Sequence, residues 1–174
     1  MSIEVADQAI SDQELQLEGI DFISSGDQYL TFTLGDEHYG LDVLKVNEIR
    51  GWDAPTLIPN APQHIKGVTN LRGTIVPIID LRIQFEVGEV TYTETTVVIV
   101  IALKNEQINR TMGFVVDAVS DVLNTEQSEI KPASSFGGSV PTEYVKGLVN
   151  VGDNVVTLLN IEQLLSLDED HVEH

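Results

Sequence analysis

Ile65-Lys66-Gly67-Val68-Thr69-Asn70-Leu71 decides the fold, because it returns without a gap as Val145-Lys146-Gly147-Leu148-Val149-Asn150-Val151, at an offset of 80 residues. The likeness continues from residues 75–81 to residues 155–161 at the same offset. Internal similarity of this length indicates two copies of one folding unit. Residues that differ between the copies are not explained by the shared fold, so they are the first candidates for function.

The repeat also extends upstream of this stretch. Gly40-Leu41-Asp42-Val43 reappears as Gly113-Phe114-Val115-Val116, and Val46-Asn47-Glu48-Ile49 reappears as Val119-Ser120-Asp121-Val122. The copies therefore share several segments in the same order along the chain.

Short extended segments separated by turns follow one another. Residues 29–34 alternate apolar and polar side chains, which is typical of a half-buried strand. Residues 68–79 predict a hairpin with a tight turn at Arg72-Gly73. Pro77 has no N–H to donate, so its strand is expected at a sheet edge or at a bulge. Many short strands with few helices indicate an all-β barrel or sandwich.

Helices are expected to be few and short. Val43, Val46 and Ile49 have helical spacing, which predicts one or two helical turns before Gly51. Asp80 and Asn160 occupy equivalent places as helix N-caps, the second before a short C-terminal helix.

The duplication predicts two similar small barrels that share one core. We expect the first barrel at about residues 30–92 and the second at about 93–160, with exchange of strands possible at their ends. The apolar stretch 97–102 lies where the copies meet, and its burial on both faces would join them into one unit.

Composition excludes several classes of protein. The 174 residues include no cysteine, which excludes disulfides and cysteine metal sites. The formal net charge is −19, and 11 of the acids lie in segments 1–27 and 168–174, which we expect to be flexible acidic tails flanking a domain at 28–167. So acidic a chain is a poor candidate for binding nucleic acid. Without an apolar run of roughly 20 residues or a secretory signal, a cytoplasmic protein with no direct membrane insertion is expected.

No catalytic constellation is recognised in the sequence. Neither a phosphate-binding Gly-rich loop ending in Lys-Ser/Thr nor a Gly-x-Ser-x-Gly elbow is present. His38 and His64 have no nucleophile or acid at a telling spacing, and His171 and His174 lie in the acidic C-terminal tail. We therefore expect no catalytic residue, no metal and no cofactor. A small β-barrel ligand-binding protein or hydrolase stays as the alternative.

The clearest difference between the copies is Arg72, which becomes Gly152 in the second hairpin turn. A turn position readily takes Gly, so Arg72 is either a solvated charge or a residue presented to a partner. Glu48 could pair with Arg72 and order a groove between their segments. Trp52, the only tryptophan, is expected either to pack in the core or to anchor an interface.

Six segments of the chain carry a recognisable pattern, at residues 34–37, 39–43, 46–51, 65–73, 76–82 and 113–122. These segments resemble the CheW family of bacterial chemotaxis coupling (adaptor) proteins, and the likeness runs from about Tyr29 to Leu165. This resemblance implies two five-stranded SH3-like barrels without catalytic activity. It also implies an adaptor that couples chemoreceptor tips to the regulatory domain of the histidine kinase CheA and helps to build receptor–kinase arrays, in which other adaptors are further candidate partners.

The same resemblance implies three contact surfaces. The tip of a methyl-accepting receptor should lie in a groove between the barrels, near Glu48, Arg72, Val97 and Val98. The kinase should contact apolar residues at Leu30, Val43 and Val46. A further array contact should fall at Lys131 and Phe136, where Lys131 replaces the arginine familiar in this family.

Overall fold

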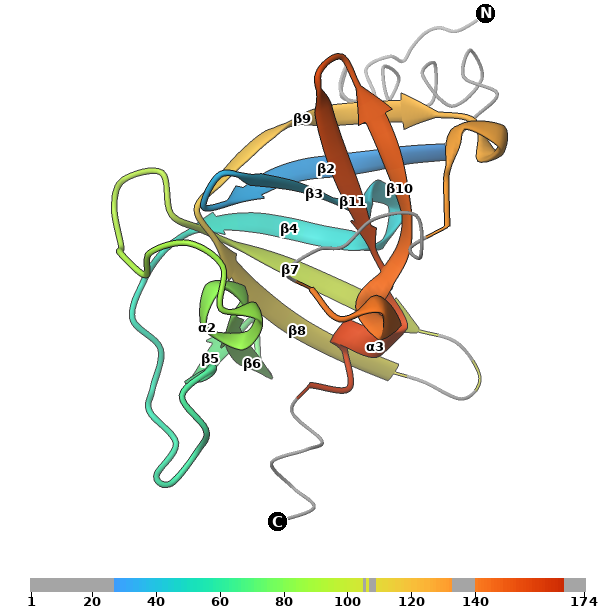
Figure 1. Ribbon diagram of the computed structural model, residues 1–174. Coiled ribbons are helices and arrows are strands. Elements are labelled where there is room, and N and C mark those ends of the chain that lie inside the picture. Colours follow the sequence, from blue (N-terminus) through green and yellow to red (C-terminus); the bar gives the residue numbers. More distant parts are fainter. Residues whose placement is uncertain (1–26, 105, 107–108, 133–139, 168–174) are drawn as a thin grey trace, which may run out of the picture.

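The computed structural model describes residues 27–104, 106, 109–132 and 140–167, and these form two five-stranded sheets (Figure 1). The first sheet has the order β10 (Val145–Val151), β11 (Asn154–Leu159), β3 (Glu37–Asp42), β2 (Asp27–Leu34), β9 (Ala118–Thr125). The second has the order β4 (Val46–Gly51), β7 (Val97–Lys104), β8 (Asn109–Val116), β6 (Thr74–Asp80), β5 (Ile65–Leu71). The short helices are η2 (Val43–Lys45), α2 (Leu81–Phe85), η3 (Gln127–Glu129), η5 (Thr142–Tyr144) and α3 (Ile161–Leu164).

The two hairpins of the repeat have the same register. In β5–β6, Ile65 lies opposite Ile79, and a bulge separates Ile65 from Gly67. In β10–β11, Val145 lies opposite Leu159, with the same bulge before Gly147. The duplication in the sequence is therefore a duplication of backbone geometry.

Each hairpin completes its sheet with strands of the other copy. β6 pairs in parallel with β8, where Ile78 lies opposite Gly113, and β11 pairs in parallel with β3, where Leu158 lies opposite Gly40. Two parallel neighbouring strands cannot be joined by a tight turn, because they need a long crossover connection. Here the parallel neighbour of each hairpin is a strand of the other copy. The sheets therefore do not follow the order of the sequence, because β2 and β3 belong to the sheet of β9, β10 and β11.

The core has three parts, as expected for two SH3-like barrels packed on each other. A shared core draws buried residues from both sheets, among them Phe32, Leu41, Ile99 and Phe114. Separate clusters fill each barrel, one around Val76 and Val100 and one around Tyr29 and Leu158. Strand β7 is buried from Val98 to Ile101, so it joins the barrels as predicted.

Of the one or two helical turns predicted before Gly51, one forms, as the 3-10 turn η2, and it ends where β4 begins at Val46 and pairs with β7. The prediction for Pro77 is wrong, because Pro77 lies in an inner strand without a bulge. Its partner Val68 exchanges its backbone hydrogen bonds with Thr56, and the ladder to β8 begins at Ile78, so neither neighbour requires a donor from Pro77.

The predicted helix caps are confirmed. The Asp80 carboxylate accepts a hydrogen bond from the Arg82 N–H at the start of α2, and the Asn160 side chain accepts one from the Gln163 N–H at the start of α3. Equivalent caps place the first helix residues of both copies alike.

Candidate functional site

The candidate site is the open side of the barrel built from β4 to β8. Strands β4 and β5 are the two edges of this sheet, and the first seam is the gap between β4 and the β5–β6 hairpin. Two hollows lie along this seam, of about 160 and 350 Å³, and Leu71 and Val100 line both of them. Arg50 lines one hollow and Arg72 the other. The seam therefore combines an apolar floor with charged rims.

An ion pair bridges the first seam. The Arg72 guanidinium donates from Nη2 to Glu48 Oε1 at 2.5 Å, and Arg50 Nη1 lies 3.5 Å from Glu48 Oε2. The hydrogen bond from Arg72 holds the pKa of Glu48 below its ordinary value, although burial acts in the opposite direction. The Arg72 side chain is 68% exposed, so such a pair contributes only about 0–1 kcal/mol to stability. Its main physical effect is to fix the direction of two charged groups at the surface.

The backbone at Arg72 is itself unusual. Its φ is 52°, in the left-handed region, and Gly73 follows with a φ of 87°, as a type I′ hairpin turn requires. Asn70 supports the turn by accepting a hydrogen bond from the Gly73 N–H at 2.8 Å. Glycine adopts this conformation without strain, and the second copy has Gly152 at φ 61°. An arginine stands at this turn against the preference of the backbone.

The other predicted receptor residues divide between two sides of β7. Val98 is 5% exposed, belongs to the cluster inside the barrel and lines the hollow beside Arg50. Val97 pairs with Gly51 and packs against the shared core. The structure thus brings Glu48, Arg72 and Val98 to the first seam, while Val97 faces the neighbouring barrel.

The predicted kinase residues lie where the chain passes from β3 to β4. Val43 is in η2 and Val46 begins β4, and both are partly buried. Leu30 is only 6% exposed and belongs to the shared core, so it can offer little surface to a partner. Sequence reasoning missed Leu44, which is 77% exposed between Val43 and Val46. The sequence signal that could have identified Leu44 is its place between Val43 and Val46, in a short apolar run interrupted only by Lys45.

The predicted array contact is only partly within the described residues. Lys131 is exposed, and its backbone exchanges two hydrogen bonds of 2.8 Å with Leu148 on β10. Phe136 lies outside the described residues. The tails 1–26 and 168–174 also lie outside them.

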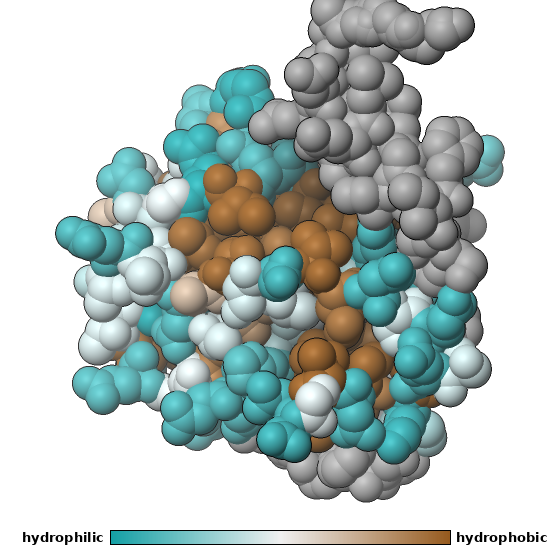
Figure 2. All heavy atoms as spheres, turned by 90° about the horizontal axis from the view of Figure 1, so that it is seen from above, coloured by the Kyte–Doolittle hydropathy of each residue, from teal (hydrophilic) through white to brown (hydrophobic). Residues whose placement is uncertain are grey.

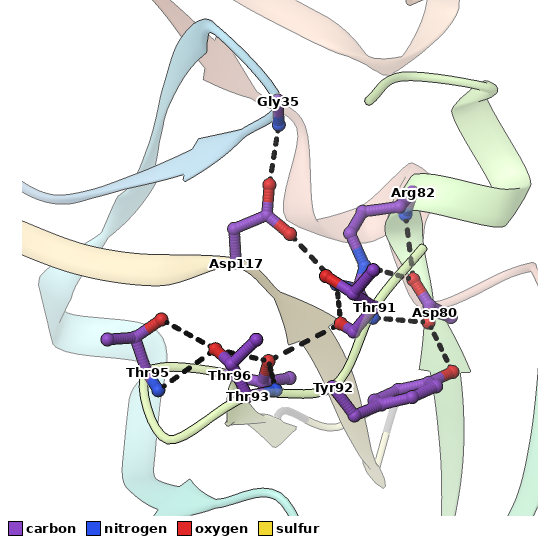
Figure 3. Close-up of polar contacts among 9 residues, drawn as sticks. All are labelled: Gly35, Asp80, Arg82, Thr91, Tyr92, Thr93, Thr95, Thr96 and Asp117. Carbon is purple, nitrogen blue, oxygen red and sulfur yellow. Dashed lines mark hydrogen bonds and ion pairs between the residues drawn. The ribbon is translucent and has the colours of Figure 1, made fainter. Parts of the chain in front are cut away.

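A buried charge network holds the connection from α2 to β7. Arg82 is 1% exposed and makes a bidentate contact with Asp80, through Nε to Oδ1 at 3.0 Å and Nη2 to Oδ2 at 2.9 Å (Figure 3). Burial lowers the pKa of Arg82, but the hydrogen bonds to Asp80 and Asp117 raise it by a larger amount. The pKa therefore lies above its ordinary value, and the guanidinium stays charged. Because every charged group in it is paired, the network is built for structure rather than for proton transfer.

The network also joins the two barrels. Arg82 Nη1 donates to Asp117 Oδ1 at 2.8 Å, and Asp117 Oδ2 accepts a hydrogen bond of 2.6 Å from the Gly35 N–H in the turn between β2 and β3 (Figure 3). Arg82 Nη1 donates as well to the Thr91 carbonyl. Sequence reasoning missed this cluster, although Asp80 and Arg82 stand two residues apart in the motif that carries the family resemblance.

Trp52 packs inward, as the first of its two expected roles requires. It contacts the cluster inside the first barrel, and its ring stacks on Tyr92 with a centroid distance of 4.3 Å. Tyr92 donates from its hydroxyl to Asp80 at 2.9 Å, and burial together with this hydrogen bond raises the pKa of Tyr92 to about 12. The stack therefore ties the end of β4 to the Arg82 network.

The fold and the first seam define a class of small double-barrel β proteins with an exposed ion pair across the open side of one barrel. A family model described as CheW-like domain matches residues 28–169, and the chain belongs to this family. Chemotaxis protein CheW of Klebsiella aerogenes is 52% identical over 144 residues, which are 83% of this chain and 84% of the relative. The Bacillus subtilis protein of the same name is 34% identical over 111 residues, 64% of this chain and 69% of the relative.

A solved structure agrees with the family assignment. The crystal structure of the scaffolding protein TtCheW from Thermoanaerobacter tengcongensis superposes with a TM-score of 0.71 at 29% identity, covering 78% of this chain and 85% of that one. Members of this family are chemotaxis scaffolds and adaptors, not enzymes. Among the described residues, no group of three or more His, Asp or Glu could hold a metal ion, and no helix is long and apolar enough to cross a membrane.

Proposed function

We propose that this chain couples the cytoplasmic tips of methyl-accepting chemoreceptors to the histidine kinase CheA and helps to assemble receptor–kinase arrays. It acts in the cytoplasm and is recruited to membrane-associated arrays. It contributes no chemistry of its own and works by holding receptor and kinase in a defined geometry. The names of its relatives support the chemotaxis role, and the bridged first seam supports the receptor contact.

The receptor tip binds along the first seam at Glu48 and Arg72. Val98 lines the hollow beside Arg50 and supports this contact from inside the barrel, whereas Val97 faces the neighbouring barrel and is not part of it. The single observation that carries this proposal is Arg72, an exposed arginine at a positive φ where the second copy has glycine. Its guanidinium is already oriented by Glu48, so less side-chain entropy is lost on binding.

The regulatory domain of CheA binds at the passage from β3 to β4. Val43 and Val46 provide the apolar contact, and Leu44 between them, at 77% exposure, is the most exposed of the three side chains. Leu30 is buried and lies on β2, which contacts η2, so it supports these residues from the core side. An exposed leucine with apolar neighbours suits a protein–protein contact.

A second kinase domain or another adaptor closes larger rings through Lys131 and Phe136. Lys131 is exposed beside β10, in the barrel that does not carry the proposed receptor contact. Because the two surfaces lie on different barrels, one chain can bind two neighbours at the same time.

Arg72→Gly tests the receptor contact without straining the turn. The variant copies the second hairpin, so it should fold normally while binding to a receptor-tip fragment weakens about tenfold or more, as for an interfacial arginine. Binding to the CheA regulatory domain should stay unchanged. Both affinities are measured with the full chain by isothermal titration calorimetry.

Leu44→Asp is the matched control, because it should show the opposite pattern. It should weaken kinase binding about tenfold and leave receptor binding intact. Unchanged receptor affinity in a well-folded Arg72→Gly variant would contradict the proposed receptor site. Loss of both affinities in either variant would contradict the separation of the two surfaces.

A further inference from the structure

The second barrel has an open seam of its own, and this seam is apolar. It lies between β9 and the β10–β11 hairpin, the two edges of the other sheet. Val151 borders it at 40% exposure, whereas its equivalent in the first seam, Leu71, is 7% exposed. The difference follows from the side chains beside the turn. Arg72 and Glu48 bridge the first seam, while the second has Gly152 and Asp121 at those places.

Apolar side chains line the second seam. Leu123 on β9 lies opposite Tyr29 on β2, and Leu123 and Ile130 pack on the cluster inside this barrel. The buried residues of that cluster are Tyr29, Val149, Val156 and Leu158. Figure 2 shows apolar atoms gathered on the face of the molecule where β9, β10 and β11 lie. Apolar surface of this kind on a soluble protein marks a contact site.

The chain itself enters the fold at the end of this seam. β2 begins at Asp27, which lies opposite Thr125 at the end of β9. Leu123 is two residues away from Thr125 along β9, about 7 Å at the usual rise of a strand. Residues 15–23 lie shortly before Asp27, and the most distant of them, Leu15, is 12 residues away. An extended chain spans up to about 3.5 Å per residue. This segment can therefore reach the whole seam.

The composition of the N-terminal segment fits the seam. Between residues 15 and 23 it carries five large apolar residues, Leu15, Leu17, Ile20, Phe22 and Ile23. Residues 1–26 contain six acids and no Lys or Arg. An entirely solvated tail does not need so many large apolar side chains.

The charged residues beside the seam are of both signs. Lys131 and Lys146 are exposed beside β10. Glu126 and Glu129 follow β9 directly, and the Glu129 carboxylate accepts hydrogen bonds from the Thr125 hydroxyl and the Glu126 N–H. The fit of the segment to the seam therefore rests on its apolar side chains and on its reach.

We propose that residues 15–23 of this chain bind in cis across the second seam and cover Leu123, Ile130 and Val151. The segment takes the place that the Arg72–Glu48 bridge takes in the first seam and covers the second seam with its apolar side chains. Because Lys131 follows Ile130 and belongs to the proposed array contact, the segment competes with that neighbour for one surface. The cis contact itself does not depend on the proposed chemotaxis role.

The absence of cysteine from the chain allows a direct test. Gln16→Cys in the full chain is labelled with a nitroxide, and amide signals of the ¹⁵N-labelled protein are compared before and after reduction of the label. Amides of Leu123 and Val149–Val151 should lose most of their intensity. Amides at the Arg72–Gly73 turn of the first hairpin should keep theirs. Equal intensities at the two hairpins would overturn the proposal.

Two further samples identify the occupant. In a mixture of ¹⁵N-labelled wild type and unlabelled, spin-labelled chain, the signals of β9 and β10 should stay intact, and their loss would assign the seam to a second copy instead. Val151→Asp should restore the intensities at β9 and β10 in the labelled chain. Ile75→Asp, beside the turn of the first hairpin and 59% exposed, adds the same charge and should not restore them. Restoration by both variants would overturn the contact with Val151.

Discussion

The two barrels have the same backbone plan but different side chains at equivalent positions. Both have the same hairpin register, the same bulge and a capped helix after the second hairpin strand. Only the first carries an arginine at the hairpin turn and a buried arginine two residues after the helix cap. The second has Gly152 and Glu162 there. The repeated backbone plan therefore does not require these arginines, although buried Arg82 stabilises the copy that carries it.

The largest effect should come from breaking the buried network in the first copy. Arg82→Leu leaves the buried Asp80 carboxylate without its ion pair, which should lower the free energy of unfolding by about 3–5 kcal/mol. The equivalent Glu162→Leu removes an exposed side chain and should change it by less than about 0.5 kcal/mol. Urea denaturation measures both. Similar losses in the two variants would show that the network is not specific to one copy.

The next effect tests what the copies share. A Cβ at Gly67 would lie 2.1 Å from the Thr56 carbonyl oxygen, and Gly67 has a φ of 143°. At Gly147 the nearest atom is Ile130 Cγ2, at 2.3 Å, which belongs to a side chain that can move. Gly67→Ala should therefore cost about 1–3 kcal/mol and more than Gly147→Ala, as measured by thermal unfolding. A larger loss for Gly147→Ala would mean that the second connection is the more rigid.

A smaller effect is expected where the first hairpin is made like the second. Arg72→Gly relieves the positive φ but loses an exposed ion pair, and the two changes should leave the free energy of unfolding within about 1 kcal/mol of the wild-type value. A loss of several kcal/mol would make Arg72 a structural residue and would remove the basis of the proposed receptor site.

The smallest effect concerns the titration of Glu48. Its pKa is lowered by Arg72, so its stabilising contribution is present above its unfolded pKa and is lost as the pH falls through its lowered folded pKa. In Arg72→Gly the pKa should rise toward the ordinary value of 4.5, as followed by carboxyl carbon NMR. An unchanged pKa would show that the ion pair does not persist in solution.

Much of the fold could be predicted from the repeat. Gly67, Asn70 and Asp80 recur as Gly147, Asn150 and Asn160, and both hairpins and both caps lie where this recurrence placed them. Which strands share a sheet could not be predicted in this way. The parallel pairs β6–β8 and β11–β3 join segments far apart in the sequence, and a strand carries no mark of its parallel neighbour.

The candidate site shows the same division. The contrast between Arg72 and Gly152 pointed to the hairpin turn, and Glu48 was expected to pair with Arg72, as it does. The exposure of Leu44 and the burial of Leu30 could not be read from hydropathy, because both are leucines in apolar surroundings. Their difference depends on which residues the other sheet covers.

The sequence by itself determined that the chain is a duplicated all-β unit, which residues break the symmetry, and which family it belongs to. These are local properties, since turn residues, caps and strand periodicity act over a few residues. Only the tertiary structure decided that the copies exchange strands, that Arg82 is buried between two aspartates, and that one seam is bridged by charge while the other is left apolar. Those outcomes depend on contacts between distant segments, which form only when both sheets pack on their shared core.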